Sequence, residues 1–186
     1  MVNDQEQSPT YKAVLRRFEP STDSVRWYLS PLEDLIKRCP WEASIAWVFL
    51  RIEQVQHRAL YCGIVKLHRV DKDLAEVALE GWQITREGFD KLFEVVFGVK
   101  LPASVRDKIK RAEGVRDKVI HGKKTTAADI RDSLVDAIAF AERLNAELKR
   151  LAGVEPCASI KGFKGRGQTH DKKTSRWILK GMGFAF

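Results

Sequence analysis

One stretch of the chain, from Trp41 to about Val70, repeats its apolar residues at steps of three and four and contains no proline. This spacing places the apolar side chains along one stripe of an α-helix, because a helix turns once in about 3.6 residues. Such a stripe must be covered by other helices to be stable in water. The stretch therefore predicts the central helix of an all-α bundle.

Apolar spacing and capping residues predict further helices on both sides of this stretch. The predicted segments run from Ser21–Asp23 to Ile36 with a break or kink at Ser30-Pro31, from Asp71 to Glu80, from Thr85 to Phe97, from Pro102 to Ile120 or His121, and from Thr126 to Leu151. No segment alternates apolar and polar residues as a strand would. We expect an all-α bundle of about five helices over residues 21–156, with aromatic residues in its core: Trp47, Phe49, Trp82, Phe89 and Phe93.

The two ends of the chain differ in composition from this body. Residues 1–20 are polar and contain Pro9 and Pro20, which predicts a loose N-terminal arm. Residues 157–186 are rich in Gly, Lys and Ser, with aromatic residues between them. Glycine in this number disfavours a helix, so we predict an appended C-terminal tail with a short ordered piece at Arg176–Leu179.

The positive charge of the chain is concentrated in this tail. Between Ala158 and Phe186 there are seven Lys or Arg against Asp171 alone, which accounts for +6 of the net charge of +8. Cations mixed with aromatic residues suit an RNA strand, because cations neutralise phosphates and rings stack on bases. The predicted RNA contacts are Lys161, Lys164, Arg166, Lys172, Lys173, Arg176 and Trp177. A solubilising or protein-docked tail remains an open alternative.

Several classes of protein are disfavoured by the sequence. There is no run of roughly 18 apolar residues and no secretory leader, which predicts a soluble, cytoplasmic protein without a membrane partner. The three cysteines, Cys39, Cys62 and Cys157, form no C-x-x-C pair, so neither a disulfide framework nor a zinc site is expected. A P-loop, a dinucleotide fingerprint and a G-x-S-x-G motif are also missing, and we expect no cofactor and no metal.

One short motif is placed where it could carry chemistry. Arg116 and His121 are separated by four residues at the predicted end of a helix, and Gly122 follows. Residues five apart lie about 140° around a helix axis, so the two side chains cannot reach one phosphate from an unbroken helix. Either the helix ends before His121, or Arg116 of one subunit completes the site of another. Asp117 shares the helical face of His121 and is placed to fix its tautomer.

This segment resembles the signature of the HEPN superfamily, which consists of an Arg, a polar residue and, after four to six intervening positions, a His that Gly commonly follows. The resemblance covers roughly Ser24–Leu151. It implies a homodimer in which two motifs face each other and cleave RNA without a metal, with catalytic roles for Arg116, Asp117 and His121. It also implies a toxin–antitoxin or antiviral-defence setting, with a protein antitoxin or regulator as a further partner.

Cleavage of RNA without a metal needs a base for the 2′-hydroxyl proton, an acid for the leaving 5′-oxygen, and a cation for the charge on phosphorus. His121 suits the first two roles, one from each subunit, and Arg116 suits the third. Lys123 and Lys124 are expected to hold neighbouring phosphates. The sequence thus predicts a metal-independent endoribonuclease of the toxin or phage-defence kind. The alternative is a non-catalytic HEPN-like module that binds RNA or a protein partner.

Overall fold

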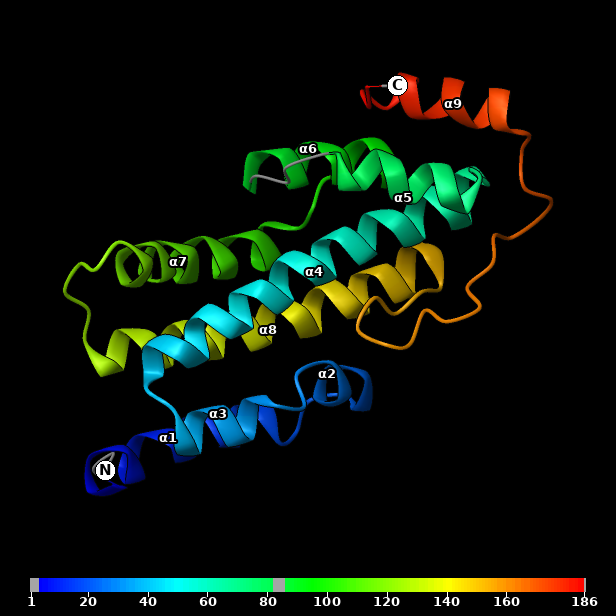
Figure 1. The fold of residues 1–186 in the computed structure, drawn as a ribbon. Coiled ribbons are helices and arrows are strands. Elements are labelled where there is room, and N and C mark those ends of the chain that lie inside the picture. Colours follow the sequence, from blue (N-terminus) through cyan, green and yellow to red (C-terminus); the bar gives the residue numbers. More distant parts are fainter. Residues whose placement is uncertain (1–3, 82–85, 186) are drawn as a thin grey trace. The chain divides into compact units, whose positions relative to one another are not determined.

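The computed structural model describes residues 4–81 and 86–185 (Figure 1). Over these residues the chain forms helices and no strand, which confirms the predicted all-α class. Within residues 21–156, where about five helices were predicted, seven are observed, and the described ranges as a whole contain nine. They are α1 (Asp4–Phe18), α2 (Asp23–Tyr28), α3 (Leu32–Arg38), α4 (Trp41–His68), α5 (Lys72–Glu80), α6 (Arg86–Phe97), α7 (Ala103–Ile120), α8 (Ala127–Ala152) and α9 (Lys172–Gly181).

The predicted boundaries of the longer helices are close to the observed ones. The stretch from Trp41 forms a single helix of 28 residues, α4. The break expected at Ser30-Pro31 is present and separates α2 from α3, because a proline has no N–H to continue a helix. Gly98 and Gly153 follow the ends of α6 and α8 at positive φ. The N-cap predicted at Thr85 and the core position predicted for Trp82 lie outside the described residues.

The capping box predicted before the last long helix is also observed. The backbone N–H of Asp129 donates to the Thr126 hydroxyl at 3.1 Å, and the Asp129 carboxylate accepts from the Thr126 N–H at 3.2 Å. The hydroxyl of Thr126 donates to the same carboxylate at 2.8 Å, and these hydrogen bonds hold the pKa of Asp129 below its usual value. Reciprocal bonds of this kind satisfy backbone donors at the start of a helix, here α8.

The chain divides into two compact units that alternate along the sequence. The first comprises the residues up to Ile52 together with Pro102–Ala146, and the second comprises Glu53–Leu101 and Glu147–Phe186. The sequence instead predicts one bundle over residues 21–156 with a separate tail. Residues after Pro156 are part of the second unit, where Leu179, Met182 and Phe184 are buried. None of the described helices combines the length and the apolar content that crossing a bilayer requires.

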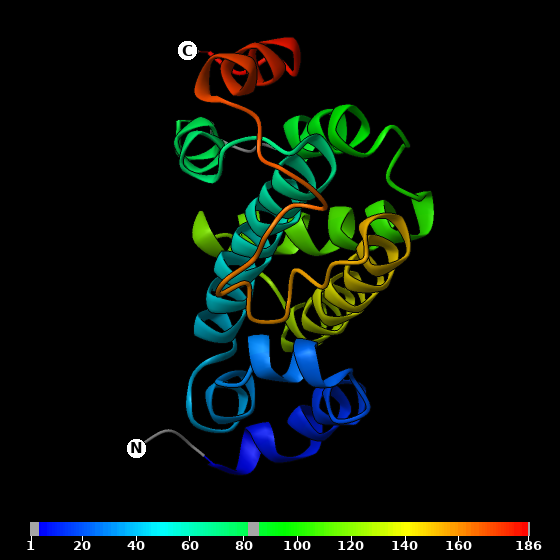
Figure 2. The same cartoon turned by 90° about the vertical axis from the view of Figure 1, so that its right-hand side faces the viewer.

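In the first unit, α1 packs on α3, and both are blue in Figure 2. The loose arm expected over residues 1–20 therefore contains a helix, which buries Val14, Leu15 and Phe18. The start of α2 is joined to α8, because the backbone N–H of Thr22 donates to the Glu142 carboxylate at 2.6 Å. These contacts give the first unit apolar and polar links between helices that are far apart in sequence.

A buried carboxylate links α7 to α8 in the same unit. Asp136, on α8, has a side chain that is only 4% exposed, and its oxygens lie 3.3 Å from the Lys108 ammonium and 2.5 Å from the Arg111 guanidinium. A carboxylate this buried needs such partners, since an unpaired charge away from water is strongly unfavourable. Both cations are on α7, so Asp136 fixes the position of the helix that ends at the Arg-x4-His motif.

The second unit packs α6 and the C-terminal segment around the later part of α4. A Cβ added to Gly63 of α4 would lie 2.5 Å from Val96 and 2.6 Å from Phe97, so only glycine permits this close approach of α6. The segment after α8, orange in Figure 2, leads to α9, which is red. Its backbone pairs with the end of α4, where the His170 N–H donates to the Arg69 carbonyl at 2.9 Å. α9 then packs on α5.

Candidate functional site

The Arg-x4-His motif lies at the end of α7 in the first unit. The helix ends at Ile120, and His121 is its C-cap residue, with φ −88° and ψ 13°. The N–H of Gly122 donates to the Val119 carbonyl at 3.0 Å, and the N–H of Lys123 donates to the Lys118 carbonyl at 2.8 Å. This pair of bonds is a Schellman motif, which requires the positive φ of 65° found at Gly122. The expectation that the helix ends before His121 is thereby confirmed.

The Arg116 side chain packs inward, toward α4. Its guanidinium carbon lies 5.2 Å from the centre of the buried Phe49 ring, and 25% of the side chain is exposed. A guanidinium over an aromatic face is held by a cation–π attraction, which also fixes the direction of the long side chain. Phe49 is buried as predicted, and it supports Arg116 in addition to filling the core.

The His121 side chain points elsewhere, since the residue is exposed beyond the end of the helix. Among the described residues, no hydrogen bond or ion pair joins its imidazole to Arg116 or to Asp117. The carboxylate of Asp117 lies 3.4 Å from the Nε of Arg116 instead. The structure therefore places the three predicted catalytic residues at one helix end without bringing their side chains together around His121 within a single chain.

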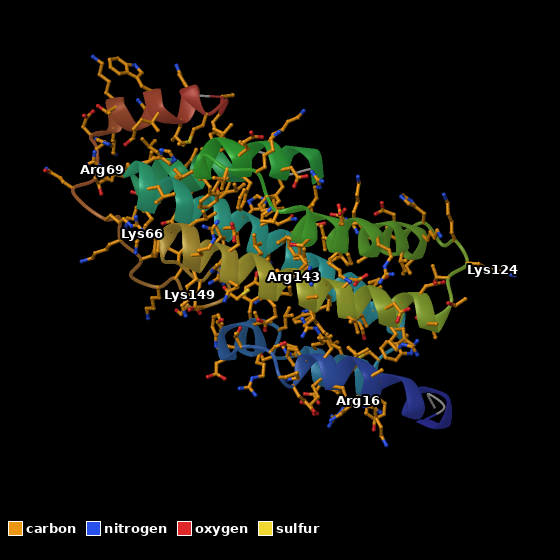
Figure 3. All side chains as sticks on the ribbon, turned by 180° about the vertical axis from the view of Figure 1, so that it is seen from behind. Arg16, Lys66, Arg69, Lys124, Arg143 and Lys149 are labelled. Carbon is orange, nitrogen blue, oxygen red and sulfur yellow. The ribbon has the colours of Figure 1, made fainter. Side chains whose placement is uncertain are left out.

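Two predicted phosphate contacts lie in the turn that follows the motif. Lys123 and Lys124 are both exposed, and Figure 3 shows Lys124 at the outer edge of the turn between α7 and α8. Ile120, directly before His121, is 56% exposed although it is apolar. The end of α7 thus presents an imidazole, two ammonium groups and one large apolar side chain to the surroundings.

The other seven predicted RNA contacts belong to the second unit, and all of them are exposed: Lys161, Lys164, Arg166, Lys172, Lys173, Arg176 and Trp177. The last four are on α9, which is longer than the short piece predicted at Arg176–Leu179. The missed signal is Asp171, whose carboxylate caps the helix by accepting from the N–H groups of Lys173 and Thr174. Hydrogen bonds from Thr174 hold the pKa of Asp171 below its usual value.

The aromatic residues of the C-terminal segment do not act alike. Phe163 is half-buried, with its ring centre 6.4 Å from that of Tyr61, and Phe184 is only 3% exposed. Both belong to the packing of the second unit. Trp177 is 63% exposed, and the Lys173 ammonium lies 5.1 Å from the centre of its ring. Of the aromatic residues described in this segment, Trp177 alone presents most of its side chain to the outside.

A hollow in the first unit was not predicted. It measures about 350 Å³ and is lined by the following residues: Trp27, Tyr28, Ser30, Pro31, Trp47 and Arg51. Trp27 is 56% exposed, and Trp47, expected in the core, is half-exposed at this hollow. The guanidinium of Arg51 lies 4.0 Å from the centre of the Tyr28 ring, so its planar face is already in contact with an aromatic residue. The apolar spacing of α4 placed Trp47 on a buried stripe that the neighbouring helices do not fully cover.

The second unit contains a cavity of about 300 Å³ between α4, α5 and Ile160, lined mainly by polar residues: His57, Arg58, Tyr61, Glu76 and Glu80. Burial lowers the pKa of His57 and raises the pKa of Tyr61. His68 is engaged elsewhere, with its Nε2 2.7 Å from the Val96 carbonyl oxygen. Among the side chains that the structure describes, no three His, Cys, Asp or Glu form a group that could hold a metal ion.

Comparison with known proteins identifies no relative of this chain. The chain matches no protein-family model, and no curated protein or solved structure is similar enough to it to show a relationship.

Proposed function

We propose that this chain is a metal-independent endoribonuclease of the HEPN type that acts through Arg116 and His121. The observation that carries the proposal is the end of α7, where the exposed His121 stands just beyond the helix and beside two exposed lysines. Imidazole is the side chain most suited to proton transfer near neutral pH, and adjacent lysines attract the phosphates of RNA. The fold supports this proposal only at the level of its helical class.

The proposed chemistry needs two imidazoles. One takes the proton of an RNA 2′-hydroxyl, whose oxygen then attacks the adjacent phosphorus, and the other protonates the 5′-oxygen that leaves. The guanidinium of Arg116 stabilises the negative charge that builds up on the phosphate oxygens. The products are a 2′,3′-cyclic phosphate and a free 5′-hydroxyl. Because one chain supplies one His121, the proposal includes a homodimer with two motifs at its interface.

The surroundings of the motif support this arrangement. Arg116 packs on Phe49 and lies 3.4 Å from Asp117, and no hydrogen bond to His121 of its own chain is described, which agrees with a site that two subunits complete. Ile120, 56% exposed, offers such an interface an apolar contact beside each motif. In the toxin or phage-defence setting implied by the resemblance, RNA in the cytoplasm is the substrate, and a protein antitoxin or regulator restrains the enzyme.

Incubation of the purified chain with total RNA in EDTA tests the proposal. We expect cleavage, and we expect His121→Ala and Arg116→Ala each to reduce its rate by roughly 10²- to 10⁴-fold. His170→Ala is the matched control, since His170 lies in the second unit on a segment without a proposed catalytic role. Asp117→Asn should have a smaller effect, because its carboxylate pairs with Arg116. Cleavage that stops in EDTA and resumes with Mg²⁺, or full activity of His121→Ala, would contradict the proposal.

A non-catalytic module that binds RNA or a protein is the second candidate. The observation that favours it is the 3.4 Å separation of Asp117 from Arg116, because among the described residues no carboxylate then orients the imidazole of His121 within the single chain. This function predicts that the wild-type chain and His121→Ala bind RNA equally and that neither cleaves it.

A further inference from the structure

The exposed face of α9 differs from the other predicted RNA contacts because its residues lie on one helix. Lys173, Arg176, Trp177 and Lys180 are spaced by three, one and three residues, which places all four within about 100° of arc on one side of the helix. All four are exposed. The opposite side carries Ser175, Leu179 and Met182, which are buried. We call the four exposed residues the α9 stripe.

The charge of this stripe is not compensated within its own helix. From Lys172 to Gly181 the helix carries four cations and no acidic residue. The neighbouring carboxylate, Asp171, has its oxygens bonded to the N–H groups of Lys173 and Thr174 and to the Thr174 hydroxyl. It is therefore occupied as the helix cap. The side chains of the stripe are exposed, so its cations can attract an external anion.

Further cations extend the positive surface toward the end of α4. Arg69 is exposed, and its backbone carbonyl accepts from His170, directly before the cap of α9. The N–H of Arg166 donates to the Lys66 carbonyl at 3.4 Å, so a second exposed arginine lies on the same segment. Figure 3 shows Lys66 and Arg69 beside the chain that leads to α9. A strand of phosphates that contacts the stripe can therefore continue onto these residues.

We infer that the α9 stripe binds single-stranded RNA, with one base stacked on Trp177 and the adjacent phosphates held by Lys173, Arg176 and Lys180. The choice of RNA rests on the proposed function, whereas the single-stranded form follows from Trp177. An exposed indole ring offers a stacking face to an unpaired base, and the bases of a duplex are already stacked on each other. The Lys173 ammonium lies over one face of the ring, 5.1 Å from its centre, so a base would stack on the other face with this cation nearby to attract its phosphate.

The structure disfavours a membrane surface as the occupant. A helix that lies in a bilayer interface inserts its apolar face into the lipid. The apolar face of α9 is buried in the second unit, where Leu179 is 0% exposed and Met182 is 8% exposed. Trp177 is the one large apolar side chain that α9 exposes. A single ring surrounded by cations suits a nucleotide better than it suits an acyl chain.

The test is fluorescence anisotropy with a labelled 12-nucleotide oligouridylate and a duplex RNA of equal length. The protein is the full chain carrying His121→Ala, so that a bound RNA stays intact. We expect tighter binding of the single strand, and we expect Trp177→Ala to weaken it roughly 10-fold, the usual effect of losing one stacked base. Trp177→Phe should retain most of the affinity. Trp27→Ala, which removes an equally exposed tryptophan from the first unit, should retain all of it.

The charges of the stripe are tested by salt dependence. Lys180→Gln should lower the slope of log affinity against log salt by about 0.7, because one phosphate contact is lost. Lys12→Gln, on the exposed surface of α1, should leave the slope unchanged. Unaltered affinity in Trp177→Ala together with an unaltered slope in Lys180→Gln would overturn the inference. Trp177-dependent binding of phosphatidylserine vesicles, with RNA binding independent of Trp177, would also overturn it in favour of a membrane.

These experiments distinguish a failure of the inferred RNA binding by the α9 stripe from a failure of the nuclease proposal. If the wild-type chain cleaves RNA while Trp177→Ala binds single strands normally, the inference fails and the proposed function stands. If the stripe variants lose binding while the wild-type chain cleaves nothing, the inference stands and the nuclease proposal fails.

Discussion

At the scale of single residues, the sequence located the motif and the end of its helix, but it could not place the side chains. Gly122 after His121 predicted the helix end correctly, because a C′ glycine is a local signal. The contact of Arg116 with Phe49 joins residues 67 positions apart, and no local pattern encodes it. Asp117 pairs instead with its sequence neighbour Arg116, because helical spacing places a residue on a face but does not fix the rotamer of its side chain.

The buried carboxylate of Asp136 gives a prediction at this scale. Asp136→Asn should lower the free energy of unfolding by about 2 kcal/mol, because Lys108 and Arg111 lose the charge they pair with. The expected loss is below that of a fully buried pair, since the Arg111 side chain is 66% exposed and partly screened by water. Urea denaturation measures the difference.

Asp132→Asn is the control for this measurement. Asp132 stands one turn earlier on α8, but its side chain is 59% exposed and pairs with its neighbour Arg131. We expect this variant to change the free energy of unfolding little. Equal effects of the two substitutions would show that Asp136 does not fix α7 to α8.

At the scale of elements, the helices with regularly spaced apolar residues were predicted well. The helices whose sequence is polar or flanked by glycine were not. α4, α7 and α8 begin and end within a few residues of the predicted positions. Only a short ordered segment was predicted where α9 lies, because glycines flank it in the sequence. Its N-cap, Asp171, is the signal that the prediction did not use. α1 was not predicted, because Pro9 and the polar composition of residues 1–20 outweighed the apolar residues that α1 buries, among them Val14, Leu15 and Phe18.

Alanine substitutions at two glycines are expected to change the stability of the chain in opposite directions. Gly63→Ala should destabilise the chain, because the new methyl would overlap Val96 and Phe97, and overpacking typically costs about 1–3 kcal/mol. Gly114→Ala, in the middle of α7, should stabilise it by roughly 0.5–1 kcal/mol, since no atom lies within 4 Å of the added Cβ. Thermal denaturation of both variants should show shifts in opposite directions, and a higher melting temperature for Gly63→Ala would refute the close contact.

At the scale of the whole molecule, the sequence predicted the helical class but not the division into two units. Two of the three boundaries fall inside α4 and α8, after Ile52 and after Ala146, where nothing in the composition changes, and the third follows Leu101, between α6 and α7. Each unit combines two segments that are far apart in the sequence, so it depends on long-range contacts that the local spacing of residues does not reveal. The composition did change at Pro156, but the residues that follow pack in the second unit and bury Leu179 and Phe184.

The proposed two-subunit site predicts a homodimer. Light scattering should give about twice the chain mass of 21.2 kDa at micromolar concentration. Ile120→Glu should reduce this mass to that of one chain and lower RNA cleavage, because it puts a charge into the proposed interface beside His121. Val95→Glu, at another exposed apolar residue, should change neither property. A monomer that still cleaves RNA would contradict the two-subunit site.

The chemical groups at the two new RNA ends test directly whether Arg116 and His121 form a metal-independent nuclease. RNA is cleaved by the wild-type chain in EDTA, and both new ends are identified by mass spectrometry. We expect a 2′,3′-cyclic phosphate on one product and a free 5′-hydroxyl on the other, because the 2′-oxygen is the nucleophile and His121 supplies the proton to the leaving oxygen. Products with a 5′-phosphate and a 3′-hydroxyl would mean that water attacks the phosphorus, and they would contradict a nuclease built on Arg116 and His121.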